Sequence, residues 1–426
     1  MSEAGMTDEQ VVAVYDVESW LPPARAAEVL ANEQSTGTFV RVPGESEALR
    51  HRFGATVLDV TELPDAGHTP LPGATRPPGA GPRPHRARVR IAFPLRNFGP
   101  SMPNLLAAVA GNLFELRELA AVRLVDLELP AAFAGRYPGP AFGVTGTRRL
   151  MGAPDGALIG TIIKPGVGLQ LDALRALVRE LASAGIDFIK DDELTGNPPH
   201  APLRDRVAVV TEELDRAADR TGRRTMYAFN ITDDIGRLEA NHDLVLAAGG
   251  TCVMVCVQTV GLAAVAHLRE RAALPVHGHR AMSGALLRSP QIGLGPLVFQ
   301  RLARLAGVDQ LHVGGIASKF YEKDEDVVAS VRAMRTPFLG GYEALPVLSS
   351  GQWPGLAHRT LELTGTTDLL VLAGGGIHAH PAGPAAGVAA MRSAWRAAAE
   401  GEPLADRAAR DPSLALALER FGGVRA

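Results

Sequence analysis

Short apolar runs alternate with helical stretches over the second two-thirds of the chain. Each run predicts a buried strand of a parallel sheet, and each following stretch with apolar residues at helical spacing predicts a covering helix. Eight such units in residues 140–426 predict a TIM (β/α)8 barrel. A doubly wound open sheet is the alternative, but no dinucleotide-binding fingerprint opens the first unit. The expected strands are 157–164, 186–192, 226–231, 252–258, 275–279, 309–314, 345–349 and 368–373, and the expected helices are 171–184, 203–221, 235–248, 261–273, 294–306, 324–334, 355–364 and 383–399.

Residues 1–139 mix strand and helix patterns without this regular alternation. Their number of elements predicts a small N-terminal α+β sandwich domain of ferredoxin-like type. The segment 64–84 is dense in proline and glycine, and we expect it to be a solvated loop. The expected strands are 11–15, 38–42, 55–60, 88–94 and 121–129, and the expected helices are 23–31 and 102–109.

The C-terminal ends of the predicted barrel strands are polar or rich in glycine. Catalytic groups of this fold lie at these ends, so seven such ends facing one mouth indicate an active site. They are Lys164 after the first strand, Lys190 to Glu193 after the second, Asn230 after the third, His277 to Arg280 after the fifth, His312 to Lys319 after the sixth, Ser349 to Gln352 after the seventh and Gly374 to Gly376 after the eighth.

The most highly charged end is Asp187-Phe-Ile-Lys-Asp-Asp-Glu193. Alternation along a strand directs Lys190 and Asp192 to one side and Asp191 to the other, and Glu193 can turn back where the pleat breaks. Converging charges are costly unless a counter-ion holds them together. Mg2+ takes oxygen ligands, and Lys190 would supply oxygen if it captured CO2 as a carbamate. An ion cluster without metal is the alternative interpretation.

Lysine and histidine side chains at other strand ends suggest acid–base groups. Burial at the end of an apolar strand would lower the pKa of Lys164 and make it a usable base, and a lysine reaching out to solvent at the rim is the alternative. His279 and His312 are candidate proton carriers. His277 lies one layer deeper and is expected to pack.

Anion-binding groups follow the later strands. Arg280 can clamp an anionic group, and Lys319 on a glycine-rich loop suggests a lid. The runs containing Ser349, Gly351, Gly375 and Gly376 expose backbone N–H groups, which form the common phosphate cradle of this fold. A rim ion pair and a plain tight turn are the alternatives.

Metal-dependent amidohydrolases combine a barrel, a His-x-His pair and a carbamylated lysine. In those enzymes the His-x-His pair comes on the first strand, and a metal-binding aspartate ends the last strand. Here Lys190 precedes His277-Gly-His279, and the eighth strand ends in glycines, so the order of the parts does not fit.

Composition adds limits on partners and location. Hydrophobic residues make up 46% and charged residues 21% of the 426 residues, so a substantial core is possible. A net charge of −3 gives no reason to expect nucleic acid or an anionic membrane as partner. No signal peptide and no membrane-spanning apolar run are visible. Cys252 and Cys256 lie too far apart along one strand for a disulfide. We therefore expect a cytoplasmic protein.

These stretches, in this order, resemble the large subunit of RuBisCO, and more closely the RuBisCO-like proteins. The resemblance covers nearly the whole chain, and the Lys-Asp-Asp-Glu motif in this context is highly specific. The matching stretches are Glu33 to Thr38, Gly111-Asn112, Leu124 to Pro130, Gly160 to Pro165, Asp187 to Glu193, His279 to Met282, Leu311 to Lys319, and Ala373 to Gly376 with His380-Pro381.

The resemblance implies a role for each site residue. It implies that Lys190 is carbamylated, with Asp192 and Glu193 completing an Mg2+ site, and that Lys164 is the catalytic lysine. It also implies a homodimer, or a higher oligomer, with active sites shared between subunits. The remaining implied residues are His279, Arg280, His312 and Lys319 lining the substrate, Ser349, Gly351, Gly375 and Gly376 holding phosphate, and Glu33, Thr38 and Asn112 reaching in from the N-terminal domain of the other subunit.

Five positions depart from the carboxylases of the family. Gly166 stands where they have a second lysine, and the loss of that charge alters the environment of Lys164. CO2 fixation on ribulose bisphosphate is therefore not expected. The other departures are Phe39 for tryptophan, Ile162 for threonine, Ser283 for histidine and Ser350 for glycine.

The chemistry that survives these departures is enolate formation next to a metal ion. We therefore expect a Mg2+-dependent enolising or decarboxylating enzyme acting on a phosphorylated keto-sugar or keto-sugar acid. The stretches 349–352 and 374–381 resemble the subgroup linked to apionate breakdown, which implies a decarboxylase or a transcarboxylase/hydrolase of 3-oxo-isoapionate 4-phosphate. An enolase or isomerase of a methylthio-sugar phosphate in methionine salvage is one alternative. A catalytically inactive dimeric scaffold or regulator is the alternative from another class.

Overall fold

The computed structural model describes residues 9–37 and 42–422, and most of the predicted strand 38–42 lies outside these ranges. The chain forms two compact units, Met1–Tyr137 with Met282–Leu302 and Pro138–Ala281 with Ala303–Ala426. The segment Met282–Leu302 therefore leaves the barrel sequence and joins the first unit. Among the described helices, none is long and apolar enough to cross a membrane.

The first unit contains a five-stranded sheet in the order β10-β4-β1-β3-β2. The central strand β1 pairs antiparallel with β3 and β4, while β10 pairs parallel with β4. One face of α1 buries Ala26, Ala27, Leu30 and Ala31, which is the spacing of an amphipathic helix. The elements are β1 (Gln10–Ser19), α1 (Pro23–Glu33), α2 (Glu47–Phe53), β2 (Thr56–Leu63), β3 (His85–Pro94), η2 (Leu95–Asn97), α3 (Met102–Ala110), η3 (Asn112–Glu115), β4 (Leu119–Glu128), α4 (Ala132–Arg136), α11 (Ser283–Leu287) and β10 (Ile292–Leu294).

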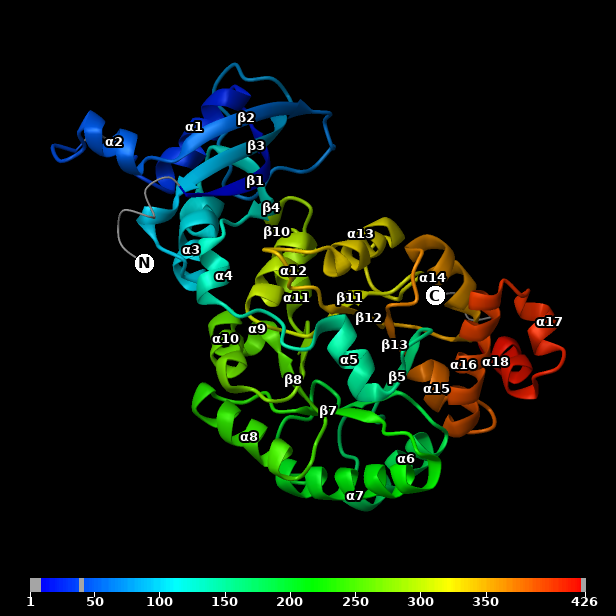
Figure 1. Ribbon diagram of the computed structural model, residues 1–426. Coiled ribbons are helices and arrows are strands. Elements are labelled where there is room, and N and C mark those ends of the chain that lie inside the picture. The colour runs from blue at the N-terminus through cyan, green and yellow to red at the C-terminus, as the bar shows by residue number, and fades with distance from the viewer. Residues whose placement is uncertain (1–8, 38–41, 423–426) are drawn as a thin grey trace. The chain divides into compact units, whose positions relative to one another are not determined.

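The second unit is a closed barrel of eight parallel strands, which confirms the predicted TIM barrel (Figure 1). Each predicted barrel strand contains an observed one. The strands are β5 (Leu158–Ile162), β6 (Phe188–Lys190), β7 (Met226–Asn230), β8 (Cys252–Cys256), β9 (Val276–His279), β11 (Gln310–Gly314), β12 (Leu345–Leu348) and β13 (Leu370–Leu372).

The helices of the second unit surround this barrel and begin close to the predicted positions (Figure 1). Several helices were not predicted, among them α5 (Gly143–Met151), where Gly143 and Gly146 interrupt a helical pattern. Besides α5, the helices of this unit are α6 (Leu171–Ser183), α7 (Leu203–Thr221), α8 (Ile235–Ala247), α9 (Val257–Val260), α10 (Leu262–Arg271), α12 (Pro296–Leu305, which crosses the division between the units), α13 (Asp324–Arg335), η4 (Pro354–Leu356), α14 (Ala357–Thr364), α15 (Gly375–His378), α16 (Pro384–Glu400), α17 (Leu404–Ala408) and α18 (Pro412–Gly422).

Apolar side chains fill the barrel below the level of the polar strand ends. Leu158, Phe188 and Met226, from three successive strands, belong to one buried cluster. Alternation along each strand directs every second side chain into this layer. Because side chains fill the barrel interior, an active site is expected at the C-terminal ends of the strands.

Candidate active site

The charged end of β6 is buried at the barrel mouth, which is the end of the barrel where the C-terminal ends of the strands meet. Lys190 is fully buried, and its Nζ donates to the backbone oxygen of Asp191 over 2.7 Å. The same Nζ lies 3.5 Å from Oε2 of Glu193, which in turn lies 3.5 Å from Nε2 of His279. Glu193 therefore turns back toward Lys190, as the sequence pattern predicts.

Asp191 faces the other side and anchors this end of the strand. Its Oδ2 accepts from Nε of Arg206 at 3.1 Å and from the backbone N–H of Asn230 at 2.8 Å, and its Oδ1 accepts from the hydroxyl of Tyr227 at 2.6 Å. Asn230 Nδ2 also donates to the backbone oxygen of Asp192 at 3.1 Å. A buried carboxylate with these partners is fully satisfied, so it holds the neighbouring acidic residues in place.

Lys164 forms an ion pair with Asp192. Its Nζ donates to Oδ2 of Asp192 over 2.7 Å. The prediction of a buried lysine is wrong, because the Lys164 side chain is 46% exposed whereas that of Asp192 is 3% exposed. The reason is that β5 ends at Ile162, two residues earlier, so the lysine leaves from the following loop. The aspartate, and not burial, sets the environment of this amine.

The donor set at this end fits Mg2+ through two carboxylates, to which Lys190 could add a third oxygen ligand. Within residues 9–37 and 42–422, no group of three or more His, Cys, Asp or Glu side chains is arranged to hold a metal. Asp192 and Glu193 supply two carboxylates, and each forms an ion pair with a lysine amine. Burial lowers the pKa of Lys190, against the opposing charges of Glu193 and Asp192. A neutral amine is the form that reacts with CO2, so a carbamate on Lys190 would complete an oxygen donor set suited to Mg2+.

Three histidines from β9 and β11 lie together beside this cluster. The rings of His279 and His312 have centroids 4.5 Å apart, and Nε2 of His277 lies 2.9 Å from Nε2 of His312. His277 is fully buried, as its deeper position predicts. Burial, together with the charge of Lys190, lowers the pKa of His277 to about 3, and burial holds the pKa values of His279 and His312 well below their usual range. All three rings are therefore neutral near pH 7.

Arg280 and Lys319 supply two cationic groups farther around the mouth. Arg280 forms an ion pair with Glu322, whose other carboxylate oxygen is buried without a hydrogen-bond partner among the described residues. Lys319 is exposed, its backbone N–H donates to the oxygen of Ser350 at 3.3 Å, and its Nζ lies over the ring of Phe320. Arg280 is thus held by a carboxylate that an anionic ligand would have to displace.

The glycine after β12 lies in a sharp turn, whereas those after β13 lie in the first turn of a helix. Ser350 and Gly351 both have positive φ, 70° and 95°, so the chain turns sharply after Ser349. Gly375 and Gly376 form the first turn of α15, whose leading N–H groups have no partner within the helix. A Cβ at Gly376 would lie 2.4 Å from the backbone oxygen of Gln352, so glycine is needed there for packing.

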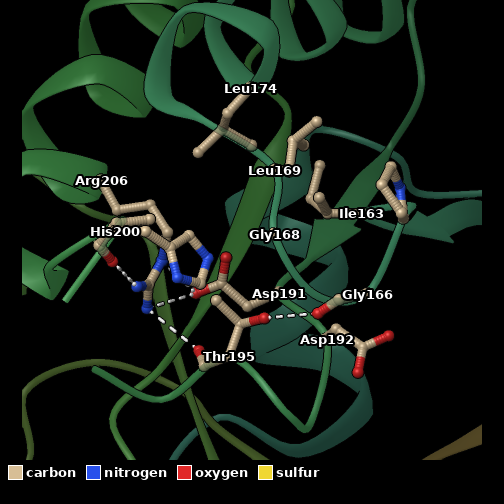
Figure 2. A pocket seen from close by; sticks show the side chains of 12 residues that line it. Ile163, Gly166, Gly168, Leu169, Leu174, Asp191, Asp192, Thr195, His200 and Arg206 are labelled. Atoms are coloured by element: carbon tan, nitrogen blue, oxygen red, sulfur yellow. Dashed lines mark hydrogen bonds and ion pairs between the residues drawn. The ribbon is translucent and has the colours of Figure 1, made fainter. Parts of the chain in front are cut away.

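Gly166 lies against the Asp192 carboxylate. A Cβ added at Gly166 would lie 2.5 Å from Oδ2 and 2.8 Å from Cγ of Asp192. Thr195 holds the loop close, because its hydroxyl donates to the backbone oxygen of Gly166 at 2.7 Å while its own carbonyl accepts from Arg206 (Figure 2). Gly166, Asp192 and Arg206 all line one small pocket. The position therefore admits no side chain with Asp192 in this rotamer.

Two of the residues that the family resemblance implies for the shared site lie in the first unit. Glu33 is the last residue of α1 and Asn112 the first of η3, and both are exposed. Gln34 connects the two places, because its amide, oriented to satisfy both of its groups, accepts from the backbone N–H of Leu113 at 3.0 Å and of Asn112 at 3.3 Å. Thr38 lies outside the described residues.

Sequence reasoning missed several residues that support this site. Gln310 and Glu322 contact the predicted residues His277 and Arg280, and Arg206 neutralises Asp191. Arg206 lies in a helix and Glu322 in a loop, and the sequence pattern there does not distinguish them from other polar residues. Gln310 opens β11 two residues before His312, and that spacing on a strand was the one available signal.

Two family models together match nearly all of the chain. The model of the ribulose bisphosphate carboxylase large chain catalytic domain matches residues 143–421, and the model of its N-terminal domain matches residues 3–133.

Individual relatives cover the chain end to end. A 3-oxo-isoapionate-4-phosphate transcarboxylase/hydrolase of Xanthobacter autotrophicus is 48% identical over 96% of this chain and 99% of its own. A 3-oxo-isoapionate-4-phosphate decarboxylase of Rhizobium rhizogenes is 42% identical over 96% of this chain and 98% of its own. The crystal structure of a RuBisCO-like protein from Burkholderia fungorum superposes with a TM-score of 0.90 at 44% identity, over 97% of this chain and 100% of that one. The chain therefore belongs to the ribulose bisphosphate carboxylase large-chain family, among its RuBisCO-like members.

Proposed function

We propose that this chain is a Mg2+-dependent enzyme that decarboxylates a phosphorylated keto-sugar acid, 3-oxo-isoapionate 4-phosphate or a close analogue, or transfers its carboxyl group to water. The observation that carries the proposal is the cluster of Lys190, Asp192 and Glu193 with Lys164 bound to Asp192. Two relatives named for reactions of that substrate support the substrate class.

The proposed metal ligands are the Lys190 carbamate, Asp192 and Glu193. Mg2+, when bound, would supply the positive charge that stabilises negative charge on the keto oxygen next to the breaking bond. The protein holds these ligands through the Asp191 network, whose partners Arg206 and Tyr227 are fully buried. Preorganised ligands of this kind add nothing to the reorganisation energy of the reaction.

Lys164 is the proposed proton carrier. Loss of CO2 leaves the electron pair of the broken bond in an enolate, which needs one proton on carbon. The partly exposed Lys164 ammonium can deliver that proton and regain it from water. Neutral His279, beside Glu193, would orient the reacting oxygens by hydrogen bonding.

The proposed phosphate and carboxylate contacts lie on the other side of the mouth. Arg280 and Lys319 would supply cationic donors. His312 and Ser349 would contact the sugar chain between the two charged ends. The backbone N–H groups near Gly351 and in the first turn of α15, at Gly375 and Gly376, would hold phosphate oxygens.

We further propose that the working form is a homodimer, or a larger assembly of dimers, with shared sites in the cytoplasm. Several large apolar side chains on the loops and at a helix start that follow the barrel strands are exposed, which suits coverage by another subunit. They are Val167, Leu194, Ile235 and Phe320. Glu33 and Asn112 would be the catalytic contribution of the other subunit, and Thr38 a substrate-binding one. Both cysteines are buried and free, in keeping with a reducing compartment.

The test is turnover of 3-oxo-isoapionate 4-phosphate with Mg2+ and bicarbonate, followed by analysis of the carbon products. With the carboxyl group of the substrate labelled with 13C, release of labelled CO2 identifies a decarboxylase, whereas labelled bicarbonate formed without free CO2 identifies transfer to water. Ribulose bisphosphate should not be carboxylated. Turnover of only a methylthio-sugar phosphate, or a melting temperature that does not respond to Mg2+ and bicarbonate, would overturn the proposal.

A further inference from the structure

A series of buried hydrogen bonds connects side chains on or directly after the neighbouring strands β9, β11 and β12, from Gln310 to Ser349. Oε1 of Gln310 lies 2.8 Å from Nδ1 of His277, and Nε2 of His277 lies 2.9 Å from Nε2 of His312. Nδ1 of His312 lies 3.0 Å from the hydroxyl oxygen of Ser349. The four side chains are each at least 93% buried, and Gln310 and His277 are fully buried. Gln310 and His277 also face each other in the register of β11 and β9.

The identity of the atoms fixes the direction of every bond in this series. The amide oxygen of Gln310 can only accept, so Nδ1 of His277 must carry a hydrogen. A neutral His277 then has no hydrogen on Nε2, so Nε2 of His312 must be the donor. Nδ1 of His312 is left as an acceptor, and the Ser349 hydroxyl must donate to it. The two neutral histidines are therefore opposite tautomers.

The orientation of the Gln310 amide decides this direction. Its Nε2 faces the hydroxyl oxygen of Thr147 and the sulfur of Met226, both at 3.4 Å, so the oxygen is the end that meets His277. With the amide reversed, every donor in the series would reverse, and the Ser349 hydrogen would point away from His312. One buried amide thus sets the polarity of a group several ångströms away at the mouth.

We propose that Gln310 is a positioning residue that fixes the tautomers of His277 and His312 and thereby makes the Ser349 hydroxyl a hydrogen-bond acceptor toward the barrel mouth. Burial keeps both histidines neutral, which this single arrangement requires. A Ser349 oxygen with its hydrogen turned inward meets a ligand hydroxyl or N–H, and it does not suit an unprotonated phosphate oxygen. The tautomer assignment does not depend on the proposed function; only the contact with substrate does.

The experiment compares wild type with Gln310→Met and Gln310→Glu by NMR of protein labelled with 15N-histidine, without ligand. Methionine removes the acceptor at similar size, whereas glutamate keeps an accepting oxygen. The matched control is Gln300→Met, since Gln300 is a buried glutamine on α12 that takes no part in the hydrogen bonds from Gln310 to Ser349. Variants His277→Asn and His312→Asn assign the signals; where they do not fold, His277→Gln and His312→Gln take their place.

Wild type should show His277 with hydrogen on Nδ1 and His312 with hydrogen on Nε2. Gln310→Met should lose this pattern, Gln310→Glu should keep the Nδ1 hydrogen on His277, and Gln300→Met should leave it unchanged. In the turnover assay, Gln310→Met should raise KM about 10-fold, the loss of one hydrogen bond, with glutamate restoring part of it. Hydrogen on Nε2 of His277 in wild type, or an unchanged pattern in Gln310→Met, would overturn the assignment whatever the substrate proves to be.

Discussion

The ammonium group of Lys164 donates to Oδ2 of Asp192 over 2.7 Å, so the proposed proton carrier and a proposed magnesium ligand share one ion pair. A metal ion that bound Asp192 would compete with Lys164 for the same oxygen. Binding of a metal at Asp192 and release of the Lys164 amine would therefore be linked, and the released amine would be available for the proposed proton transfer.

Replacing Lys164 by methionine should separate these two roles. Turnover should fall by about 100-fold to 10,000-fold, because a general acid is lost. The rise in melting temperature with Mg2+ and bicarbonate should persist or grow, because Asp192 loses its competing partner. Lys323→Met, at an exposed lysine outside the site, is the control. A variant that no longer responds to Mg2+ would show that Lys164 holds the metal site together.

Gly166→Ala should weaken metal binding without unfolding the barrel. The added methyl would lie 2.5 Å from Oδ2 of Asp192 and would push that carboxylate from its place. We expect the Mg2+ concentration needed for half-maximal stabilisation to rise about 10-fold to 100-fold. Gly236→Ala is the matched control: a Cβ there meets nothing within 4 Å, and alanine should stabilise α8 by about 0.5–1 kcal/mol. Equal Mg2+ responses in the two variants would refute the proposed crowding.

Shared active sites predict complementation between two inactive variants. Lys190→Ala removes a proposed metal ligand from the barrel, and Glu33→Gln alters the residue that each subunit is proposed to supply to the site of the other subunit. In a mixed dimer one site carries both changes and the other carries neither. Random reassociation should therefore restore about a quarter of wild-type activity, since half of the dimers are mixed and each has one intact site. Activity that stays at the level of the separate variants would argue for sites built within one chain.

Asp191→Asn should be strongly destabilising although Asp191 is not a proposed ligand. Arg206 and Asp191 are both 1% exposed, and their side chains are bonded at 3.1 Å. Loss of the negative charge leaves a buried guanidinium uncompensated, for which we expect a decrease of about 3–5 kcal/mol in the free energy of unfolding. Denaturant titration at pH 7 measures it. A decrease below 1 kcal/mol would mean that the carbonyl oxygens around Arg206 stabilise its buried guanidinium without the charge of Asp191.

Acid should weaken the contact between α6 and α7 through Glu213. This buried carboxylate is bonded to Arg179 at 2.8 Å and also contacts Arg175 and Arg216, and these hydrogen bonds lower its pKa from 4.5 to about 2. Because the folded-state pKa is the lower one, the contribution to stability is complete above pH 4.5 and is lost as the pH falls toward 2.

The measurement is the free energy of unfolding of wild type and Glu213→Gln as a function of pH. The difference should be about 1–2 kcal/mol at pH 7, reduced by the solvent exposure of the arginines, and should vanish near pH 2. Asp215→Asn, which removes an exposed ion pair with Arg224, should change stability by less than about 0.5 kcal/mol. A difference that does not depend on pH would show that Glu213 acts by packing alone.

The sequence predicted the barrel well because parallel buried strands are short apolar runs with polar ends. It predicted poorly where an element depends on a distant partner. The strand Ile292–Leu294 is three residues long with a central glycine, and only pairing with β4 makes it a strand. Local pattern carries no information about such pairing.

The candidate site shows the same division. Lys190 and Glu193 converge because β6 ends at Lys190 and the chain turns before Glu193, and the break in the pleat could be inferred from the order of the residues. The exposure of Lys164 depends on where β5 ends, and the polarity of the hydrogen bonds through Gln310 depends on which end of an amide faces which neighbour. These are properties of three-dimensional contacts between strands that lie far apart in sequence.

The pairing of β10 with β4 also affects how the N-terminal sheet can fold while the protein is being synthesised on the ribosome. The last strand of the N-terminal sheet is encoded more than 160 residues after its neighbour, since Ile292 pairs with Val122. While the intervening strands are being synthesised, the open side of β4 has unsatisfied backbone groups and can recruit another nascent chain. A chaperone that shields this side, or synthesis slow enough to keep neighbouring ribosomes apart, would protect the sheet until its final strand emerges.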